Sequence, residues 1–165
     1  VLMVRDGDWK HQRRILVAVN VSGEQEYQDE FNQELVETGI SLAENLNRGN
    51  VHLVAAYPSA PINMAIDLPE FNTSGYENGI RGQHLINMKA LRQKFGIDED
   101  HTHVREGFPE EIIPEVAKEI EAELVILGTV GRTGLSAALL GNTAEHVISK
   151  LSCNLLGIKP SKKDD

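Results

Sequence analysis

Residues 124–150 read LVILGTVGRTGLSAALLGNTAEHVISK and combine an apolar run, several glycines and an amphipathic stretch. The run at 124–127 has the length and the branched side chains of a buried strand. Four glycines follow it, at Gly128, Gly131, Gly134 and Gly141. A helix is predicted to begin at Asn142 or Thr143, directly after the last glycine. Backbone N–H groups in a glycine-rich turn and at a helix N-terminus can face an anion, so the stretch predicts a phosphate site.

The glycine spacing differs from the two common phosphate motifs. A P-loop requires Gly-Lys-Ser/Thr after its glycines, and the dinucleotide motif places its three glycines within about six residues. Here two residues separate Gly128 from Gly131, and nine separate Gly131 from Gly141. A tight glycine loop without any ligand is the alternative to a phosphate site, and the spacing alone leaves both interpretations open.

The rest of the chain alternates strand and helix patterns. The expected strands are 14–21, 51–57, 101–106, 124–127 and 154–158, and the expected helices are 26–47, 83–95, 110–121 and 143 onward. This order predicts an α/β, Rossmann-like fold: a five-stranded, mainly parallel sheet with helices on both faces. Parallel strands end at one edge of a sheet, so Asn20 and the glycine loop should meet there.

Residues 58–82 are the least regular part of the chain. Prolines and large apolar side chains alternate there without clear periodicity, and a loop of this length is unusual inside a domain. The segment predicts either a lid or ligand groove, or a simple hydrophobic cover for the sheet.

Composition limits the partners and the compartment. The formal net charge of −9 argues against nucleic-acid and anionic membrane partners, both of which require a positive surface.

Cys153 is the only cysteine and adjoins an apolar strand, which predicts a buried, inert thiol. His101 and His103 share one face of an expected strand, but without an acidic or thiol partner we expect no metal there. No apolar run reaches membrane-spanning length, and we expect a cytoplasmic location.

The two ends of the chain resemble each other. Residues 1–6, VLMVRD, and 155–160, LLGIKP, are both apolar runs that end in a base and a breaker. We therefore expect 1–12 to be the terminal strand of a preceding domain or a linker, 13–160 to be the domain, and 161–165 to be a tail. An ordinary edge strand is the alternative for 1–6. The final strand, 154–158, is expected to be exposed for a homodimer contact or for pairing with a preceding homologous domain.

Four blocks of the chain resemble the universal stress protein family. They are ILVAVNVS from Ile15, EGFP from Glu106, LGTVGRTGL from Leu127 and LGNTAE from Leu140. The blocks occur in the family's order and spacing over nearly the whole chain. The chain is most similar to the second domain of a two-domain member, which would make it a piece of a longer protein. The resemblance implies the universal stress protein fold and ATP binding.

The same resemblance implies a nucleotide site. Its residues would be Val19, Asn20, Val21, Ser22, Ala55, Ala56, Gly128, Thr129, Gly131, Arg132, Gly141, Asn142 and Thr143. The glycines would surround the ribose and phosphates, Asn142 and Thr143 would lie at the phosphates, and Mg²⁺ would be held mainly by phosphate oxygens. Asn20 stands where the family usually has an aspartate near adenine, and Asn142 replaces Ser or Thr after the third glycine.

Three functions follow as alternatives. The first is an ATP-binding and regulatory module in bacterial stress response, which is not an enzyme. The second is a weak ATPase, although the sequence offers no convincing base to position water. The third is an interaction module that binds an amphipathic ligand or a protein partner through residues 58–82.

Overall fold

Branched apolar residues form the centre of the sheet. Ile15, Leu16 and Val17 of the second strand and Val125 and Ile126 of the fifth have no exposed surface. In the computed structural model the strands are β1 (Leu2–Met3), β2 (Arg14–Ala18), β3 (Asn50–Tyr57), β4 (Thr102–Glu106), β5 (Leu124–Gly128) and β6 (Asn154–Ile158). The helices are α1 (Glu26–Asn45), α3 (Thr73–Lys94), α4 (Pro109–Glu119) and α5 (Asn142–Lys150), with a short 3₁₀ turn, η1 (Glu99–His101).

The structure describes residues 1–5, 13–23, 26–46, 49–59, 72–129 and 142–160, without the side chains of residues 26, 73 and 142–144. Within these residues no helix is both long enough and apolar enough to cross a bilayer.

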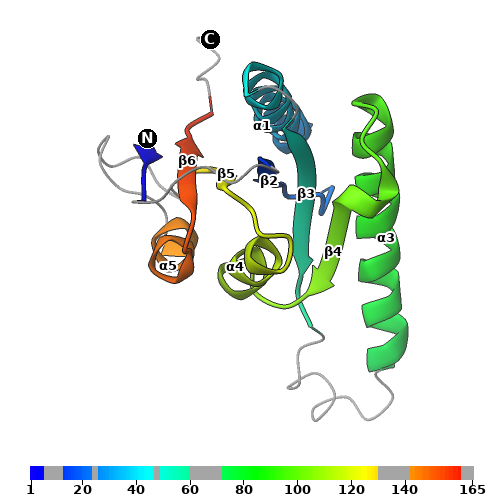
Figure 1. Ribbon diagram of the computed structural model, residues 1–165. Helices are drawn as coiled ribbons and strands as arrows, with labels where there is room; N and C mark the ends of the chain where they lie inside the picture. Colours follow the sequence, from blue (N-terminus) through cyan, green and yellow to red (C-terminus); the bar gives the residue numbers. More distant parts are fainter. Residues whose placement is uncertain (6–12, 24–25, 47–48, 60–71, 130–141, 161–165) are drawn as a thin grey trace, which may run out of the picture.

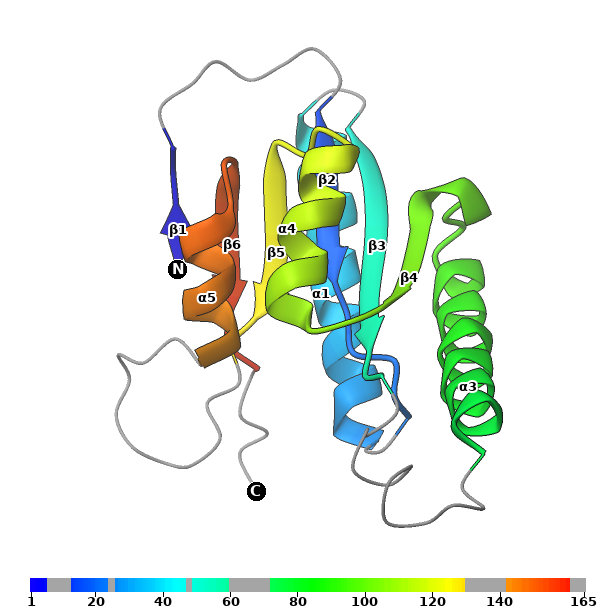
Figure 2. The same cartoon turned by 90° about the horizontal axis from the view of Figure 1, so that it is seen from below.

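The predicted α/β architecture is confirmed. The strand order is β1-β6-β5-β2-β3-β4, and every neighbouring pair is parallel except β1 with β6. Helices α1 and α3 pack on one face of the sheet, and α4 and α5 pack on the other (Figure 1). In Figure 2 the helices α4 and α5 lie in front of the sheet and α1 lies behind it. Five of the strands therefore end at the same edge of the sheet.

The number of strands differs from the expectation, because the sheet has six strands and not five. β1 pairs antiparallel with β6, with Leu2 opposite Leu156 and Met3 opposite Leu155, and it points against its neighbour in Figure 2. The outer edge of β6 is thus occupied, which corrects the expectation of an exposed final strand. The division of the chain into 1–12, 13–160 and 161–165 stays a prediction.

The start of α3 also corrects an expectation. The sequence predicted a helix from residue 83, whereas α3 begins at Thr73 and includes the last part of the supposedly irregular segment 58–82. The Asn72 side chain accepts a hydrogen bond from the Gly75 N–H at 2.9 Å, which satisfies a free donor of the first turn. Glycines in this turn hid the helical periodicity, but the cap is sufficient to start the helix.

Candidate functional site

A cleft of about 720 Å³ opens at the carboxyl ends of β2, β3 and β5. Its floor is made by Ala18, Ala56, Leu127 and Gly128 at the ends of these strands. One side is formed by α3, through Tyr76, Gly79, Ile80, Gln83 and His84. The turn between β4 and α4 contributes Gly107, Phe108 and Pro109. The size and position are those of a small-molecule site in a parallel α/β sheet.

Several residues of the predicted nucleotide site meet in this cleft. The lining includes Val19, Asn20, Ser22, Ala56 and Gly128, which come from three separate parts of the chain. The parallel sheet brings them together, as the common carboxyl edge predicted.

Other predicted residues lie elsewhere or are not described. Val21 and Ala55 are buried in the core between the sheet and α1. The Thr129 N–H donates to the carbonyl oxygen of Ile158 at 2.7 Å, so this group completes the pairing of β5 with β6. Gly131, Arg132 and Gly141 lie outside the described residues, as do the side chains of Asn142 and Thr143. Their roles as ligand contacts stay predictions.

The loop after β2 is fixed by two asparagines from helices. Asn32 of α1 accepts a hydrogen bond from the Asn20 N–H at 3.1 Å and donates to the Asn20 carbonyl at 2.7 Å. Asn87 of α3 donates to the Val21 carbonyl at 2.8 Å. The Ser22 N–H donates to the Asn20 Oδ1 at 3.1 Å. The backbone of this loop is therefore held in one conformation at the mouth of the cleft.

We expect Asn32→Ala to destabilise the fold by about 1–3 kcal/mol, because both Asn20 backbone groups lose their partner in a partly buried place. Asn32 itself is buried, which limits replacement by water. Asn45→Ala is the control, since Asn45 lies on the same helix, is exposed and, among the described residues, bonds the Ser41 carbonyl alone. Asn32 lies inside α1, where alanine is the better helix former, whereas Asn45 is the last residue of the helix, so the difference in urea unfolding is a lower bound for the Asn32 clamp, the pair of hydrogen bonds from Asn32 to the Asn20 backbone. Equal stabilities of the two variants would contradict the clamp.

The described lining of the cleft is uncharged. Its polar side chains are Asn20, Ser22, Gln28, Tyr76, Gln83 and His84, and the described part includes no Asp, Glu, Lys or Arg. His84 is buried, and its Nδ1 lies 2.9 Å from the Ile80 carbonyl oxygen. A carbonyl only accepts, so Nδ1 carries the proton, and Nε2 has a free lone pair when the ring is neutral. The described wall suits a neutral, partly aromatic group such as a nucleoside.

The sequence indicated the contribution of α3 only in part, because Tyr76, Gly79 and Ile80 fall in the possible ligand groove 58–82, whereas Gln83 and His84 lie beyond it. Tyr76, Gly79, Ile80, Gln83 and His84 all come from this helix, and none was among the predicted site residues. The signal that could have found them is Asn72 three residues before Gly75, a helix cap placed directly before this stretch.

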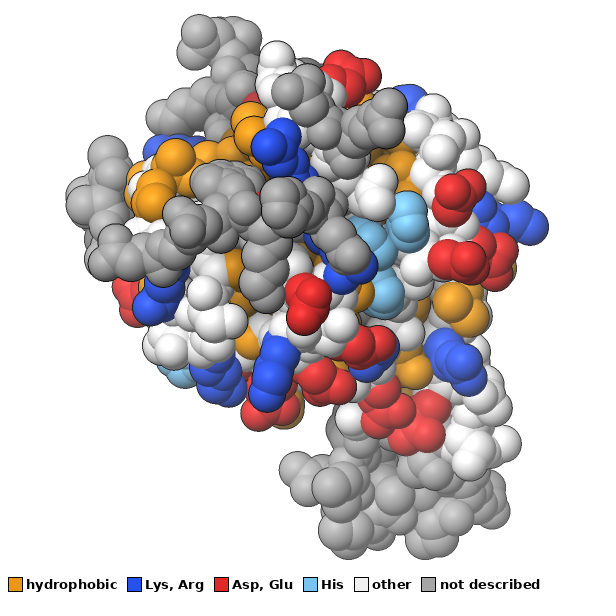
Figure 3. Space-filling model, in the orientation of Figure 1, with side chains coloured by type: hydrophobic (Ala, Val, Ile, Leu, Met, Phe, Trp, Pro, Cys, Tyr) orange, Lys and Arg blue, Asp and Glu red, His pale blue; other side chains and the backbone are white. Residues whose placement is uncertain are grey.

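Three histidines meet at the other end of the sheet. Nδ1 of His52 in β3 lies 3.3 Å from Nε2 of His103 in β4, and the ring of His101 lies 4.2 Å from that of His52 between centroids. Figure 3 shows a histidine patch on this side of the molecule, next to acidic and basic side chains. No group of three His, Cys, Asp or Glu side chains in the described part of the chain is arranged to hold a metal ion.

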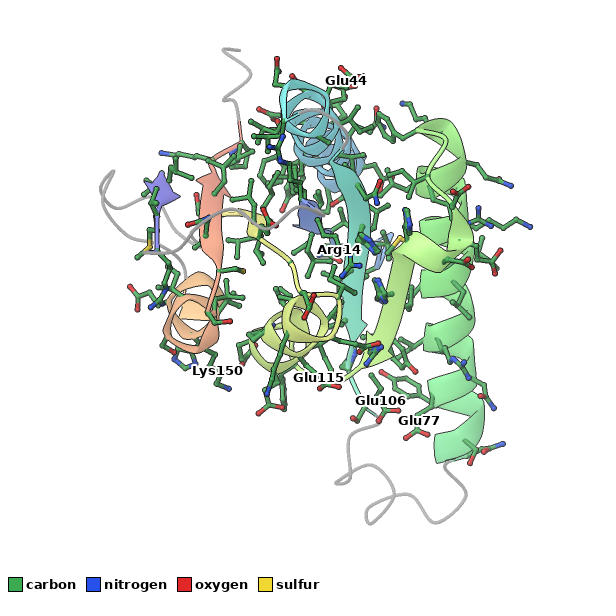
Figure 4. The ribbon with its side chains drawn as sticks, in the orientation of Figure 1. Arg14, Glu44, Glu77, Glu106, Glu115 and Lys150 are labelled. Carbon is green, nitrogen blue, oxygen red and sulfur yellow. The ribbon has the colours of Figure 1, made fainter. Side chains whose placement is uncertain are left out.

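Burial and neighbouring charges lower the pKa of two of these histidines. Burial lowers the pKa of His52 from 6.5 to about 4, and His101, His103 and Arg14 add to this. Arg14 lies beside β3 in Figure 4. The pKa of His103 is lowered by burial and by other charges near it. The fold therefore favours the neutral form of His52 and of His103.

Cys153 is half-buried and not in a disulfide. Burial raises the pKa of its thiol, which lowers the fraction of reactive thiolate. This agrees with an inert thiol.

The parallel sheet, its two helical layers and the cleft at its carboxyl edge define a doubly wound α/β domain. The chain belongs to the universal stress protein family, whose sequence model matches residues 12–159. It is 99% identical over 165 residues to the universal stress protein E homolog of Haemophilus influenzae, covering 100% of this chain and 53% of that protein. The chain thus spans about half the length of the curated relatives it matches, as the resemblance to a two-domain member predicted.

Solved structures share the fold. A putative universal stress protein from Pseudomonas aeruginosa is 27% identical with a TM-score of 0.74, over 96% of this chain and 51% of that one. A universal stress protein crystallised in complex with cAMP is 19% identical with a TM-score of 0.52, over 91% of this chain and 98% of that one. The second likeness concerns the fold alone.

Proposed function

We propose that the cleft binds a nucleotide, with ATP as the first ligand to test, and that the chain is a binding and regulatory module in bacterial stress response in the cytoplasm. The observation that carries this proposal is the cleft of about 720 Å³, bordered by a clamped loop at the carboxyl edge of a parallel sheet. Membership of the universal stress protein family supports it. So does the cAMP complex of a protein with the same fold.

The uncharged described lining suggests how the nucleotide would lie. The base and ribose would occupy the wall formed by β2, β3 and α3. The phosphates would extend from Gly128 toward the N-terminus of α5, where Asn142 and Thr143 begin the helix. Gly131, Arg132 and Gly141 complete this proposed phosphate end, and Mg²⁺ would be held mainly by the phosphates and water.

An amphipathic ligand is a second candidate for the same cleft. Pro58, Tyr76, Gly79 and Ile80 come from the irregular segment 58–82 and line the cleft, so such a ligand would compete with a nucleotide. Mass spectrometry of the molecule that co-purifies with the chain distinguishes the two. A weak ATPase is a further alternative, and phosphate release from ATP measures it.

Assembly is part of the proposal. We propose a homodimer or pairing with a preceding homologous domain; because β1 already pairs with β6 at Leu155 and Leu156, a homodimer would use another surface or displace β1. Sedimentation of the chain over a range of concentrations tests the homodimer.

A pair of glycines on α3 provides the test of ligand binding. Gly79 lines the cleft and Gly82 does not, and a Cβ at either position meets nothing within 4 Å. Leucine at either position raises helix propensity by about 0.8 kcal/mol, so both variants should be at least as stable as the unchanged chain.

We expect Gly79→Leu to lower the affinity for ATP by about tenfold or more, because its side chain occupies the cleft. Gly82→Leu should bind ATP as the unchanged chain does. Isothermal titration calorimetry measures both affinities. ATP binding that is unaffected by Gly79→Leu would place the nucleotide elsewhere, and no binding to the unchanged chain would overturn the proposal.

A further inference from the structure

The side-chain amide of Asn20 is held in one orientation. Its Oδ1 lies 3.1 Å from the Ser22 backbone nitrogen. A backbone N–H can only donate, so the amide atom that faces it must be the oxygen. The Nδ2 group, with its two N–H donors, is therefore the free end of this side chain. Asn20 is exposed and lines the cleft, and within the described residues no partner of Nδ2 is found.

The surrounding contacts hold the backbone of Asn20 in the position from which its side-chain oxygen reaches the Ser22 N–H. Both backbone groups of Asn20 are bound by the buried side chain of Asn32, and the Val21 carbonyl is bound by Asn87. A reversed amide would direct its N–H groups at the Ser22 N–H and lose the only hydrogen bond that Oδ1 makes here.

We propose that Asn20 is a specificity-determining hydrogen-bond donor, which selects ligands that present an acceptor oxygen to it over ligands that present an amine. The oxygen belongs either to the carbonyl of a nucleobase or to a phosphoryl group, which share this chemistry. The inference rests on the proposed nucleotide binding and adds the kind of atom that the site accepts. The described lining contains no Lys or Arg that could attract a ligand oxygen. The Asn20 amide therefore has more influence on which ligand binds.

The test uses two ligands and one nearly isosteric substitution. ATP and ITP differ at position 6 of the base, where ATP has an amine and ITP a carbonyl oxygen. Asn20→Asp keeps an oxygen to accept from the Ser22 N–H and replaces the donor by a second, negatively charged acceptor. Asn20→Ala removes the donor without adding a charge. Affinities of all three chains for both nucleotides are measured by isothermal titration calorimetry, with thermal melting to confirm folding.

If the oxygen is on the base, the unchanged chain binds ITP about fivefold more tightly than ATP. Asn20→Asp reverses this preference and Asn20→Ala abolishes it. If the oxygen is phosphoryl, the unchanged chain binds both nucleotides equally. Asn20→Asp then weakens both by about tenfold, through lost donation and charge repulsion, and Asn20→Ala weakens both less.

Two results would overturn the inference. If Asn20→Asp binds both nucleotides as the unchanged chain does, Asn20 selects nothing while the proposed function stands. If the unchanged chain prefers ATP and Asn20→Asp does not weaken ATP binding, the amide is not the donor described here. No binding of either nucleotide to the unchanged chain overturns the proposed function and this inference together.

Discussion

Gly128→Ala is expected to obstruct the cleft and to destabilise the fold. A Cβ at this position would lie 2.3 Å from Cε1 and 2.9 Å from Cζ of Phe31, much closer than carbon atoms can approach. Phe31 is buried and lines the cleft, with closely packed core residues on its other sides. Its ring must therefore move toward the cleft. Overpacking of this kind costs about 1–3 kcal/mol, and we expect ATP affinity to fall by about tenfold.

A second substitution tests whether the clash with Phe31 causes the effect of Gly128→Ala. Phe31→Leu removes the ring that the added methyl group would meet, and alone costs up to about 1.5 kcal/mol. The double variant Gly128→Ala/Phe31→Leu should then be more stable than the sum of the single effects predicts, by about 1 kcal/mol or more. Urea unfolding of the four chains measures this coupling, and calorimetry measures whether ATP binding returns. Simple additivity would show that Gly128 and Phe31 do not compete for space.

The folded chain should lose stability as the pH falls from 6.5 toward 4. His52 has a pKa of about 4 in the folded state and 6.5 as its ordinary value, so in this range the unfolded chain binds more protons. The stability that the neutral ring provides is complete above pH 6.5 and is lost as the pH approaches about 4. For the full shift the loss is about 3 kcal/mol, since one pKa unit corresponds to about 1.4 kcal/mol.

The charged groups around the cluster act in both directions. His101, His103 and Arg14 disfavour a proton on His52. Arg105 disfavours one on His103, while Glu119 of α4 favours it. Arg105 is itself paired with Glu119 at 2.7 Å and with Glu115 at 3.3 Å. Positive charge on the histidines would therefore also act on the ion pairs that join β4 to α4. Glu115 projects from α4 in Figure 4.

His52→Leu is the variant that tests this pH dependence. It removes the titrating ring and keeps a side chain suited to a buried strand position, so most of the loss below pH 6.5 should disappear. His146→Gln, which changes an exposed histidine on α5, is the control and should follow the unchanged chain. Urea unfolding at several pH values between 4 and 8 gives the slopes. Identical slopes for His52→Leu and the unchanged chain would contradict the assignment to His52.

The sheet and its helices were predictable because each buried strand is a continuous apolar run. The run at 14–21 gave β2, and 154–158 coincides with β6. The direction of the chain through alternating strands and helices then determined the parallel order and the edge at which Asn20 lies. These properties are local or depend only on connection handedness, so one sequence is enough to infer them.

Other features depend on contacts between distant residues. The sequence does not reveal that His52 joins His101 and His103, because only the register of β3 with β4, in which Val54 lies opposite His103, brings them together. The hydrogen bonds of Asn32 could likewise not be predicted, because the sequence does not show which backbone groups a polar residue on a helix will reach. A buried asparagine beside Phe31, on the apolar face of α1, was the available hint.

β1 is only two residues long, yet it covers part of the outer edge of β6. It occupies the outer backbone positions of β6 at Leu155 and Leu156, where another chain would otherwise add a strand. At the opposite margin β4 is short and carries Arg105 and Glu106, whose charges oppose the stacking of a foreign strand. β1 is in turn the outermost strand on its side, where Val1, Leu2 and Val4 are exposed, so the shortness of β1 is what limits the addition of a further strand there.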